Sequence, residues 1–194
     1  MNVDPRVEQI LDLEIKNEGG YVDNPHDKGG PTKYGNSLRE AQKWGLELDI
    51  DGDGQVTAAD IAQLTPEKAK AVYLKKYFVL PSFNYLPTEI QAQVVDTGVL
   101  SGPGRAAIIL QEVLDQVRQT APDLKLPVIK TDGSIGHVTE DAAAAAQKAM
   151  GPFLSNALVE ARVVYLNHVA DNNPADEDFR HGWIRRARSF QVAV

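Results

Sequence analysis

The sequence predicts a mainly α-helical (α+β) fold with a small β-containing lobe near the N-terminus. Apolar residues recur at helical spacing over most of the chain, turn-forming residues cluster in one early segment, and no linker separates two halves cleanly. The chain has 194 residues, is 43% hydrophobic and carries a net charge of −7. This composition is typical of a globular protein, and the negative charge argues against nucleic acid as a partner.

The composition also excludes several kinds of site. Because the chain has no cysteine, it has no disulfide, no thiol nucleophile and no zinc site built from cysteine. No apolar run approaches the roughly 18 residues that a transmembrane helix needs. The N-terminus lacks the basic region and apolar core of a readable signal peptide. We expect no transmembrane segment and synthesis in the cytoplasm, and we also expect a monomer.

The first predicted helix begins at Asp4 and Pro5, which are a favourable N-cap and a favourable first helical residue. Gly19 and Gly20 stop this helix directly after Glu18. Glu18 continues the apolar stripe of the helix, so we expect its side chain to be partly buried against that stripe. The carboxylate would then lie where the core ends and a cleft begins.

Residues 21–35 are rich in Gly, Pro, Asn and Asp, which favours turns and a short β-hairpin. Further helices are predicted over residues 37–48, from Thr65 onward, and over residues 88–98, 106–117, 138–150, 153–170 and 177–190. We divide the chain into a catalytic region at residues 1–86 and a helical region at residues 87–194, and we expect the two to pack as one body.

Residues 49–60 follow the twelve-residue pattern of an EF-hand calcium loop. Carboxylates stand at loop positions 1, 3 and 5, and a glycine stands at position 6, where the chain turns sharply. At position 12, Asp60 replaces the usual Glu, and its shorter side chain predicts weaker binding or a smaller ion, with one more water. Without a metal, the segment would be an exposed Asp-Gly turn. Since only one such loop is present, we expect one structural calcium ion, held by Asp49, Asp51, Asp53, Gln55, Thr57 and Asp60.

Two carboxylates and a hydroxyl stand at the turn-rich segment. Glu18 shortly precedes it, and Asp27 and Thr32 lie within it. A hairpin can bring them around one cleft. Cleavage of a glycosidic bond needs a carboxylic acid that protonates the leaving oxygen and a polar group that positions water or stabilises the transition state. The alternative is that Asp27 bonds local backbone N–H groups and that Thr32 only completes the hairpin.

The segments Glu18–Tyr21 (Glu-Gly-Gly-Tyr) and Gly29–Gly35 (Gly-Gly-Pro-Thr-Lys-Tyr-Gly) resemble glycoside hydrolase family 108. This family contains N-acetylmuramidases of phage endolysins and related bacterial cell-wall enzymes. The resemblance implies a lysozyme-like fold with Glu18 as general acid. Phage-type lysozymes place Glu, Asp and Thr with eight and then five intervening residues, whereas this chain has eight and four.

The resemblance continues beyond the catalytic segment. Residues 86–190 are similar to the predicted peptidoglycan-binding region that accompanies the family. Within the early segment, catalysis is assigned to Glu18, Asp27 and Thr32. Substrate binding is assigned to Tyr21, Asn24 and Tyr34, and the alternative for the two tyrosines is packing within the lobe.

The resemblance implies an endolysin-type lysozyme (EC 3.2.1.17) that cleaves the β-1,4 bond between N-acetylmuramic acid and N-acetylglucosamine. The same acid would serve a lytic transglycosylase that forms anhydro-muramic products, and a non-catalytic cell-wall-binding module is the third alternative. We expect the partner to be bacterial peptidoglycan, reached in the periplasm after release from the host cytoplasm.

The chain as a whole is acidic, but arginines cluster in its last predicted helix. They form either a solvated face that complements the helix dipole or a contact with the anionic cell envelope. The arginines concerned are Arg180, Arg185, Arg186 and Arg188.

Overall fold

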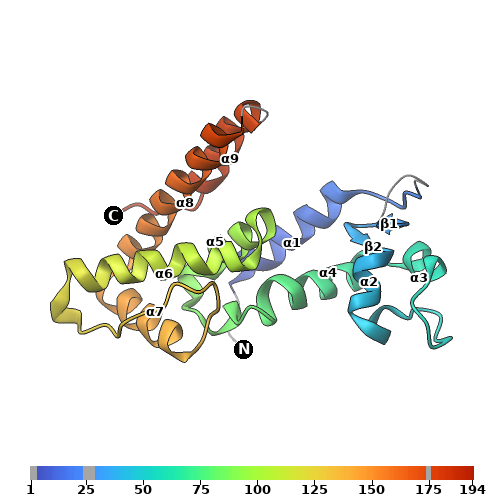
Figure 1. The fold of residues 1–194 in the computed structure, drawn as a ribbon, viewed down its shortest axis with the longest axis horizontal. Helices are drawn as coiled ribbons and strands as arrows, with labels where there is room; N and C mark the ends of the chain where they lie inside the picture. The colour runs from blue at the N-terminus through green and yellow to red at the C-terminus, as the bar shows by residue number, and fades with distance from the viewer. Residues whose placement is uncertain (1–3, 24–28, 174–175) are drawn as a thin grey trace. The chain divides into compact units, whose positions relative to one another are not determined.

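The structure is a computed structural model that describes residues 4–23, 29–173 and 176–194 (Figure 1). It confirms a mainly helical fold with one small two-stranded sheet near the N-terminus. The chain divides into two compact units, one formed by Glu8–Lys76 and the other by Met1–Val7 with Tyr77–Val194. We call them the N-terminal unit and the C-terminal unit. The division at residue 86 stays a prediction.

The helix α1 (Pro5–Glu18) begins as the sequence predicts. The backbone N–H of Arg6 donates a hydrogen bond of 2.8 Å to Asp4 Oδ1, which satisfies one of the free donors at the helix start. The sheet of the N-terminal unit consists of β1 (Thr32–Lys33) and β2 (Asn36–Ser37), which pair antiparallel. Residues 34–35 form the connecting turn.

In the described part of the N-terminal unit, three short helices and a 3₁₀ turn follow the sheet: α2 (Leu38–Lys43), the 3₁₀ turn Gly45–Leu48, α3 (Ala58–Gln63) and α4 (Pro66–Leu74). The helix predicted over residues 37–48 is therefore shorter, because Gly45 adopts a positive φ of 64° that an α-helix does not accept. At α4, Thr65 caps the helix and Pro66 occupies its first turn, as predicted.

The core of the N-terminal unit joins α1, α2, α3 and α4. Side chains from all four helices meet in one cluster, so the unit buries an apolar centre of its own. The buried members are Ile15, Ala41, Leu48, Ile61, Leu64, Ala69 and Val72, and Tyr34, Leu38, Trp44, Ile50 and Val56 pack against them.

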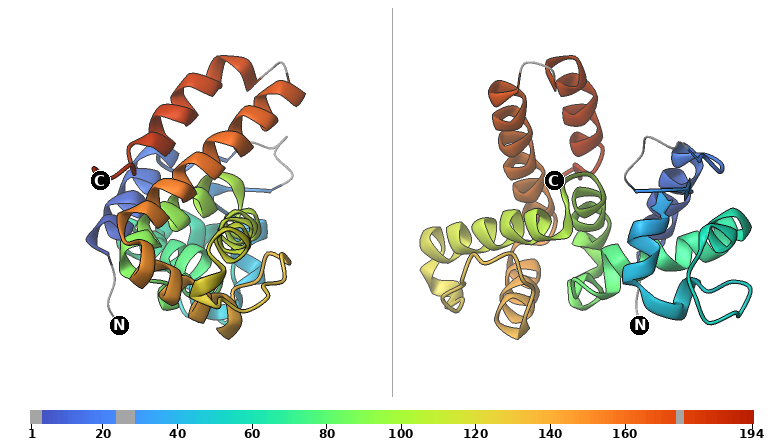
Figure 2. Two further views of the ribbon diagram at one scale, coloured as in Figure 1. Left: turned by 90° about the vertical axis from the view of Figure 1, so that its left-hand side faces the viewer. Right: turned by 45° about the vertical axis from the view of Figure 1, so that its right-hand side comes forward.

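The described residues of the C-terminal unit form five longer helices: α5 (Thr88–Ser101), α6 (Pro103–Thr120), α7 (His137–Met150), α8 (Pro152–Asn172) and α9 (Glu177–Arg188). Every residue of α5 from Ile90 to Gly98 is buried, so α5 is the central helix of this unit. The helices α8 and α9 lie side by side, as both views in Figure 2 show. None of the helices that the structure describes could span a membrane.

The contact between α8 and α9 is apolar at its centre and ionic at its base. Val159, Val163 and Leu166 of α8 pack on Ala187 of α9. At the base, buried Asp96 of α5 receives hydrogen bonds from two arginines. Arg162 Nη2 donates to Asp96 Oδ2 at 2.6 Å, and Arg186 Nη2 donates to Asp96 Oδ1 at 2.7 Å. One carboxylate therefore ties three helices together.

Candidate active site

The chain that leaves α1 returns along the hairpin, and this places Glu18 at the base of the sheet. Gly19 ends the helix with a φ of 77°. Val22 and Thr32 then exchange backbone hydrogen bonds of 2.9 and 2.8 Å, and the N–H of Tyr34 donates to Gly19 O at 3.2 Å. These bonds fix the end of α1 beside the turn of the hairpin.

The turn itself has positive φ at both central residues, 49° at Tyr34 and 69° at Gly35, as a two-residue type I′ turn requires. Tyrosine rarely adopts such a conformation, so Tyr34 holds backbone strain. The side-chain amide of Asn36 donates a hydrogen bond of 2.9 Å to Tyr34 O and supports the turn. The strained turn therefore sets the position of the Tyr34 ring.

The Glu18 side chain lies against this turn. A methyl group on Gly35 would come 3.0 Å from Glu18 Cγ, 3.1 Å from its carboxyl carbon and 2.1 Å from the hydroxyl oxygen of Tyr73 in α4. The carboxyl of Glu18 and the hydroxyl of Tyr73 therefore lie on the same side of Gly35. Because both distances start from the same Cβ position, the Glu18 carboxyl carbon and the Tyr73 hydroxyl oxygen can be no further apart than 3.1 Å and 2.1 Å added together. Three segments distant in the sequence meet here.

Glu18 is exposed, so the expectation that it is partly buried against the apolar stripe of α1 is wrong. The helix extends beyond the core, and its buried face ends at Ile15. The buried carboxylate of the stripe is that of Glu14, which is 8% exposed.

A pocket of about 630 Å³ lies next to this helix end, between α1, the hairpin turn and the start of α4. Gly19, Gly20 and Tyr34 line it, whereas Glu18 does not. Lys70 and Asp12 also line it, and Lys70 bonds to Asp12 at 2.9 Å and to Glu8 at 3.2 Å. An ion-pair cluster between α1 and α4 is therefore part of the pocket wall, and Glu18 directly precedes the two lining glycines.

Two of the other predicted site residues, Thr32 and Tyr21, lie on or beside the hairpin, and their assigned roles stay predictions. The Thr32 hydroxyl donates a hydrogen bond of 3.2 Å to Gly30 O, which supports the hairpin. The Tyr21 ring is 42% exposed. Desolvation, the Asp23 charge and a hydrogen bond to Asp23 raise the pKa of the Tyr21 hydroxyl. Asn24 and Asp27 lie outside the described residues.

Sequence reasoning did not find Tyr73 or Glu14. Both residues are nearly buried polar side chains, and both have partners in the structure. Glu14 could have been found, because it stands at a core position of the α1 stripe, three residues after Leu11. Tyr73 likewise stands on the predicted inner face of α4, with Ala69 and Val72, but its approach to Glu18 depends on how α4 packs.

The acidic loop brings together three of its six predicted ligands. Carboxylate oxygens of Asp49, Asp51 and Asp53 lie within 4.8 Å of one another and could hold a metal ion. The two oxygens of Asp49 accept N–H bonds from Gly52, Asp53 and Gly54 at 2.7, 3.1 and 2.9 Å. The loop is therefore already curled around its first carboxylate.

Asp60, the fourth predicted acidic ligand, is turned to the backbone instead. Its Oδ1 accepts N–H bonds from Ile50 and Asp51 at 2.7 and 3.2 Å, and its Oδ2 accepts from Thr57 N and Oγ1 at 2.7 and 3.1 Å. Thr57 and Asp60 thereby form the capping box of α3. These hydrogen bonds lower the pKa of the Asp60 carboxyl, and the bond from the Thr57 N–H has the largest effect.

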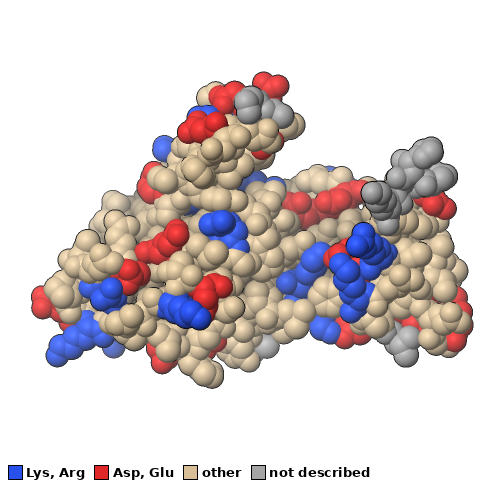
Figure 3. All heavy atoms as spheres, in the orientation of Figure 1, with Lys and Arg blue, Asp and Glu red and all other residues tan. Residues whose placement is uncertain are grey.

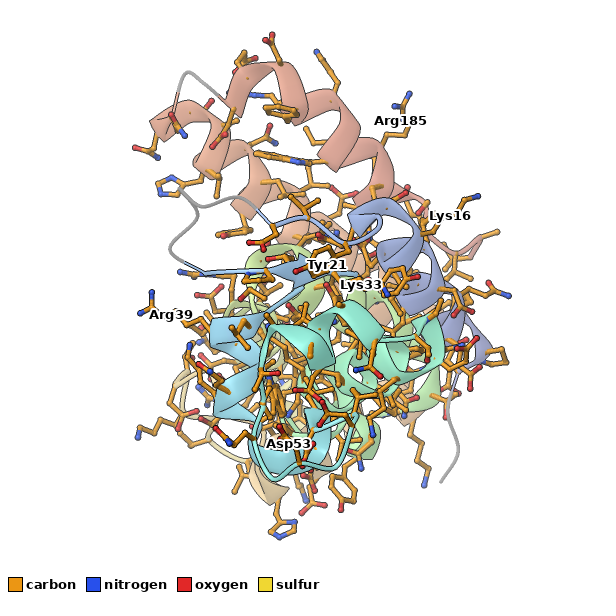
Figure 4. The ribbon with its side chains drawn as sticks, turned by 90° about the vertical axis from the view of Figure 1, so that its right-hand side faces the viewer. Lys16, Tyr21, Lys33, Arg39, Asp53 and Arg185 are labelled. Carbon is orange, nitrogen blue, oxygen red and sulfur yellow. The ribbon has the colours of Figure 1, made fainter. Side chains whose placement is uncertain are left out.

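The candidate site and the acidic loop are separate within the N-terminal unit. Figure 4 shows Tyr21 and Lys33 at the hairpin and Asp53 well apart from them. An ion bound at Asp49, Asp51 and Asp53 would therefore support the unit and would not touch a substrate at Glu18.

The arginines of α9 are mostly paired. Arg186 bonds to Asp96, Arg180 bonds to Asp171 and Glu177, and Arg188 lies 3.8 Å from Glu160. Only Arg185 has no acidic partner among the described residues, and it extends outward from α9 in Figure 4. On the face shown in Figure 3, basic and acidic side chains are interspersed. The contact with an anionic envelope stays a prediction.

Comparisons with known proteins agree with this arrangement. The sequence model of the glycosyl hydrolase 108 family matches residues 11–102, and that of a predicted peptidoglycan domain matches residues 105–188. The solved structure of SagA from Brucella abortus is similar, with a TM-score of 0.61 and 27% sequence identity over 94% of this chain and 90% of that chain. No curated protein matches the chain.

Proposed function

The chain carries a glycosyl hydrolase 108 domain followed by a predicted peptidoglycan domain, and we propose that it is an N-acetylmuramidase with a lysozyme-like catalytic region. The substrate bond is the β-1,4 linkage between N-acetylmuramic acid and N-acetylglucosamine in peptidoglycan. One observation carries the proposal: the carboxyl of Glu18 lies against the strained hairpin turn, beside an open pocket, within the segment that matches the hydrolase family.

In the proposed reaction, Glu18 is the general acid. Its carboxyl proton passes to the glycosidic oxygen as the bond from that oxygen to the muramic C1 breaks. A water molecule adds its oxygen to C1, and its proton passes to a carboxylate, for which we propose Asp27. Because Glu18 is exposed in the free protein, we expect the bound glycan itself to exclude water from the carboxyl.

The remaining roles follow from position. Thr32 stands at the start of β1, and its hydroxyl oxygen can accept a hydrogen bond from the attacking water while it donates to Gly30 O. Tyr34 lines the pocket with its ring position set by the turn, and we propose that it stacks on a sugar ring, with Tyr21 and Asn24 as further contacts.

The test is a Glu18→Gln variant with Glu112→Gln as its matched control, because Glu112 is an exposed glutamate of α6 that does not line the pocket. Both variants are incubated with purified peptidoglycan, and the soluble products are analysed by mass spectrometry. We expect Glu18→Gln to lose at least about a hundredfold in rate, and Glu112→Gln to retain activity. Unchanged release of products by Glu18→Gln would remove Glu18 as the acid.

The same analysis decides between the proposal and its alternatives. A muramidase leaves a reducing muramic end, whereas a lytic transglycosylase leaves an anhydro product that is lighter by one water. A non-catalytic wall-binding module would release no product from either form. Anhydro products would keep the role of Glu18 but replace water by the muramic C6 hydroxyl.

We also propose that the acidic loop binds one structural calcium ion. The three clustered carboxylates would repel one another at neutral pH, and a divalent cation would offset that repulsion. Gln55 would add its backbone oxygen and Thr57 its hydroxyl, and Asp60 would join the ion only by leaving its bonds to the backbone. The loop would then act on the stability of the N-terminal unit.

A further inference from the structure

One face of α9 is left uncovered by the part of the chain that the structure describes. The helix packs on α8 through Trp183, Ile184 and Ala187, and α8 is the described element with which it makes most of its contacts. The residues of the opposite face are all exposed, and they include Asp178, His181, Gly182 and Arg185. This face is therefore free to receive a partner.

Gly182 lies at the middle of the uncovered face. A glycine in the interior of a helix is destabilising relative to alanine, because it loses more backbone freedom on folding. A Cβ on Gly182 would meet no described atom within 4 Å, so the packing of the chain itself does not require a glycine there. What the missing side chain does allow is the close approach of another backbone to α9.

The two sides of this face carry different chemistry. On one side, the rings of Phe179 and Trp183 stack with their centroids 6.0 Å apart, and Phe179 is 58% exposed. On the other side lie His181 and Arg185. Arg185 has no acidic partner among the described residues and extends outward from α9 in Figure 4. Aromatic rings and guanidinium groups attract each other, but on a single copy of α9 the two sides point apart.

Two copies of α9 that cross antiparallel at Gly182 bring these two sides together. Phe179 and Arg185 stand three residues before and after Gly182, about 60° to either side of it around the helix axis. A two-fold axis at Gly182 therefore places Phe179 of one copy opposite Arg185 of the other. By the same symmetry, Trp183 of one copy faces His181 of the other. Each contact occurs twice, so the face is complementary to itself.

The charges at the two ends of α9 favour the same arrangement. Acidic side chains stand in its first turn and basic side chains in its last turn. In an antiparallel pair, the acidic turn of each copy lies beside the basic turn of the other, and the helix dipoles are opposed as well. A parallel pair would instead place like charges side by side.

We propose that the uncovered face of α9 is a homodimer interface, in which two copies of the chain pack antiparallel about Gly182. This departs from the monomer that we expect from the sequence. Because each copy contributes one short helix, the interface is smaller than the standard size of about 1,600 Å². We therefore expect a weak dimer, with a Kd of about 10 μM.

Such a dimer would carry two predicted peptidoglycan domains. A repetitive polymer can engage both domains at once, which raises the overall affinity without any new contact. The dimer itself does not rest on the proposed function, since it is measured as a mass in solution and not as hydrolysis.

Sedimentation equilibrium of the full chain, from about tenfold below to tenfold above the expected Kd, measures the association. We expect the mass to rise from 21.2 kDa towards twice that value. Gly182→Leu places a bulky side chain in the contact and should stay a monomer. Its Tm at low concentration should not fall, because its Cβ meets open space and leucine favours the helix.

Phe179→Ala and Arg185→Ala test the facing pair. Each should weaken the dimer by about fivefold or more, because every dimer holds two such contacts. The double variant should be no weaker than the weaker of the two single variants, since both changes remove the same contact. Phe153→Ala and Arg39→Ala are the matched controls and should dimerise like the wild type. Phe153 is also 58% exposed, and Arg39 is an exposed arginine of α2.

Single cysteines test the orientation, because the chain has no cysteine of its own. In the antiparallel dimer, Gly182→Cys faces itself across the axis and should form a disulfide-linked dimer on oxidation. Two copies of Ser189→Cys would lie about 21 Å apart along the helices, which is too far for a disulfide. Both positions are exposed, so each cysteine is equally open to the oxidant.

A wild type that stays a monomer at the highest concentration would overturn the proposal. Equal linking of Gly182→Cys and Ser189→Cys would also overturn it, since that result indicates a parallel or random contact. So would dimers of Gly182→Leu or Phe179→Ala as tight as those of Phe153→Ala. If one of the non-cysteine variants unfolds, the comparison of the two cysteine variants decides.

Discussion

The side chain of Glu18 lies so close to the backbone of Gly35 that a methyl group there would approach Glu18 Cγ to 3.0 Å. Glycine is required at position 35 for two reasons. The turn needs a φ of 69°, and the space that a Cβ would occupy is taken by Glu18 and the hydroxyl of Tyr73. Contact with the hairpin turn therefore limits the positions that the Glu18 carboxyl can take.

Replacing Gly35 by alanine should displace the Glu18 carboxyl and lower the rate of peptidoglycan hydrolysis. We expect a loss of about tenfold to a hundredfold in kcat, because small misplacements of a catalytic group are costly. We also expect a loss of about 1–3 kcal/mol in the free energy of unfolding from the strained backbone. Turnover of labelled peptidoglycan and urea unfolding measure the two effects.

The control is Gly45→Ala. Gly45 has a similar φ of 64° but no atom within 4 Å of the position that a Cβ would take. It should therefore show the loss of stability without the loss of rate. Adding Tyr73→Phe to Gly35→Ala should restore part of the stability, since the shortest overlap, 2.1 Å, is with the Tyr73 hydroxyl. Equal rates of peptidoglycan hydrolysis for Gly35→Ala and Gly45→Ala would show that contact with the turn does not position the Glu18 carboxyl.

Local signals in the sequence were sufficient for most of the helices. Asp4 and Thr65 are side chains that bond the first N–H groups of α1 and α4, and this chemistry is readable without a structure. The break of the helix after Lys43 was missed, because a glycine at Gly45 indicates a positive φ only once the path of the chain is known.

The candidate site was predictable only in part. The motif at Glu18 and the hairpin places the carboxylate and the turn beside each other, as the pairing of Val22 with Thr32 bears out. The exposure of Glu18 and the approach of Tyr73 depend on how far α1 extends beyond the core and on how α4 packs. Neither quantity is encoded in a local pattern.

Calcium should raise the melting temperature of the protein, and a chelator should lower it again. An ion that binds only the folded state adds about 2.7 kcal/mol at a hundredfold excess over its Kd. For a unit of this size we expect a rise of about 5 °C or more in Tm. Differential scanning calorimetry with calcium and with EDTA measures the change.

Asp51→Asn and Asp53→Asn separate the ion from the loop itself. Each carboxylate accepts one N–H bond within the loop, from Asp53 at 3.1 Å and from Gln55 at 2.8 Å, and an asparagine oxygen can accept the same bond. We expect an unchanged Tm in EDTA and a smaller rise with calcium. A wild-type Tm that changes neither with calcium nor with EDTA would contradict the proposed calcium site.

Replacing Asp96 by alanine should strongly destabilise the C-terminal unit. Asp96 is 2% exposed and Arg162 is 3% exposed, so the variant would leave the guanidinium buried without its counter-charge. Burial already lowers the pKa of Arg162, against the opposing effect of Asp96. We expect a loss of about 3–5 kcal/mol in the free energy of unfolding, measured in urea.

Asp115→Ala is the matched control for Asp96→Ala. Asp115 pairs with Arg118 at 2.8 Å, but both side chains are about one third exposed, at 29% and 31%. Because water screens a pair of this kind, we expect Asp115→Ala to lose much less stability than Asp96→Ala. Similar losses for the two variants would show that Arg162 finds water or another partner when Asp96 is removed.

Asp132 should make the stability of the C-terminal unit depend on pH. Its Oδ1 accepts hydrogen bonds from the Ser134 N–H at 3.0 Å and from Gln111 Nε2 at 3.2 Å, and these bonds lower the pKa of Asp132 below its ordinary value of 3.8. The ionised form is therefore favoured in the folded state. Its contribution is fully present above pH 3.8 and is lost as the pH falls through the lower folded pKa. Urea unfolding of the wild type and of Asp132→Asn should differ by a constant amount near neutral pH and converge in acid, and a difference that grows in acid would refute the assignment.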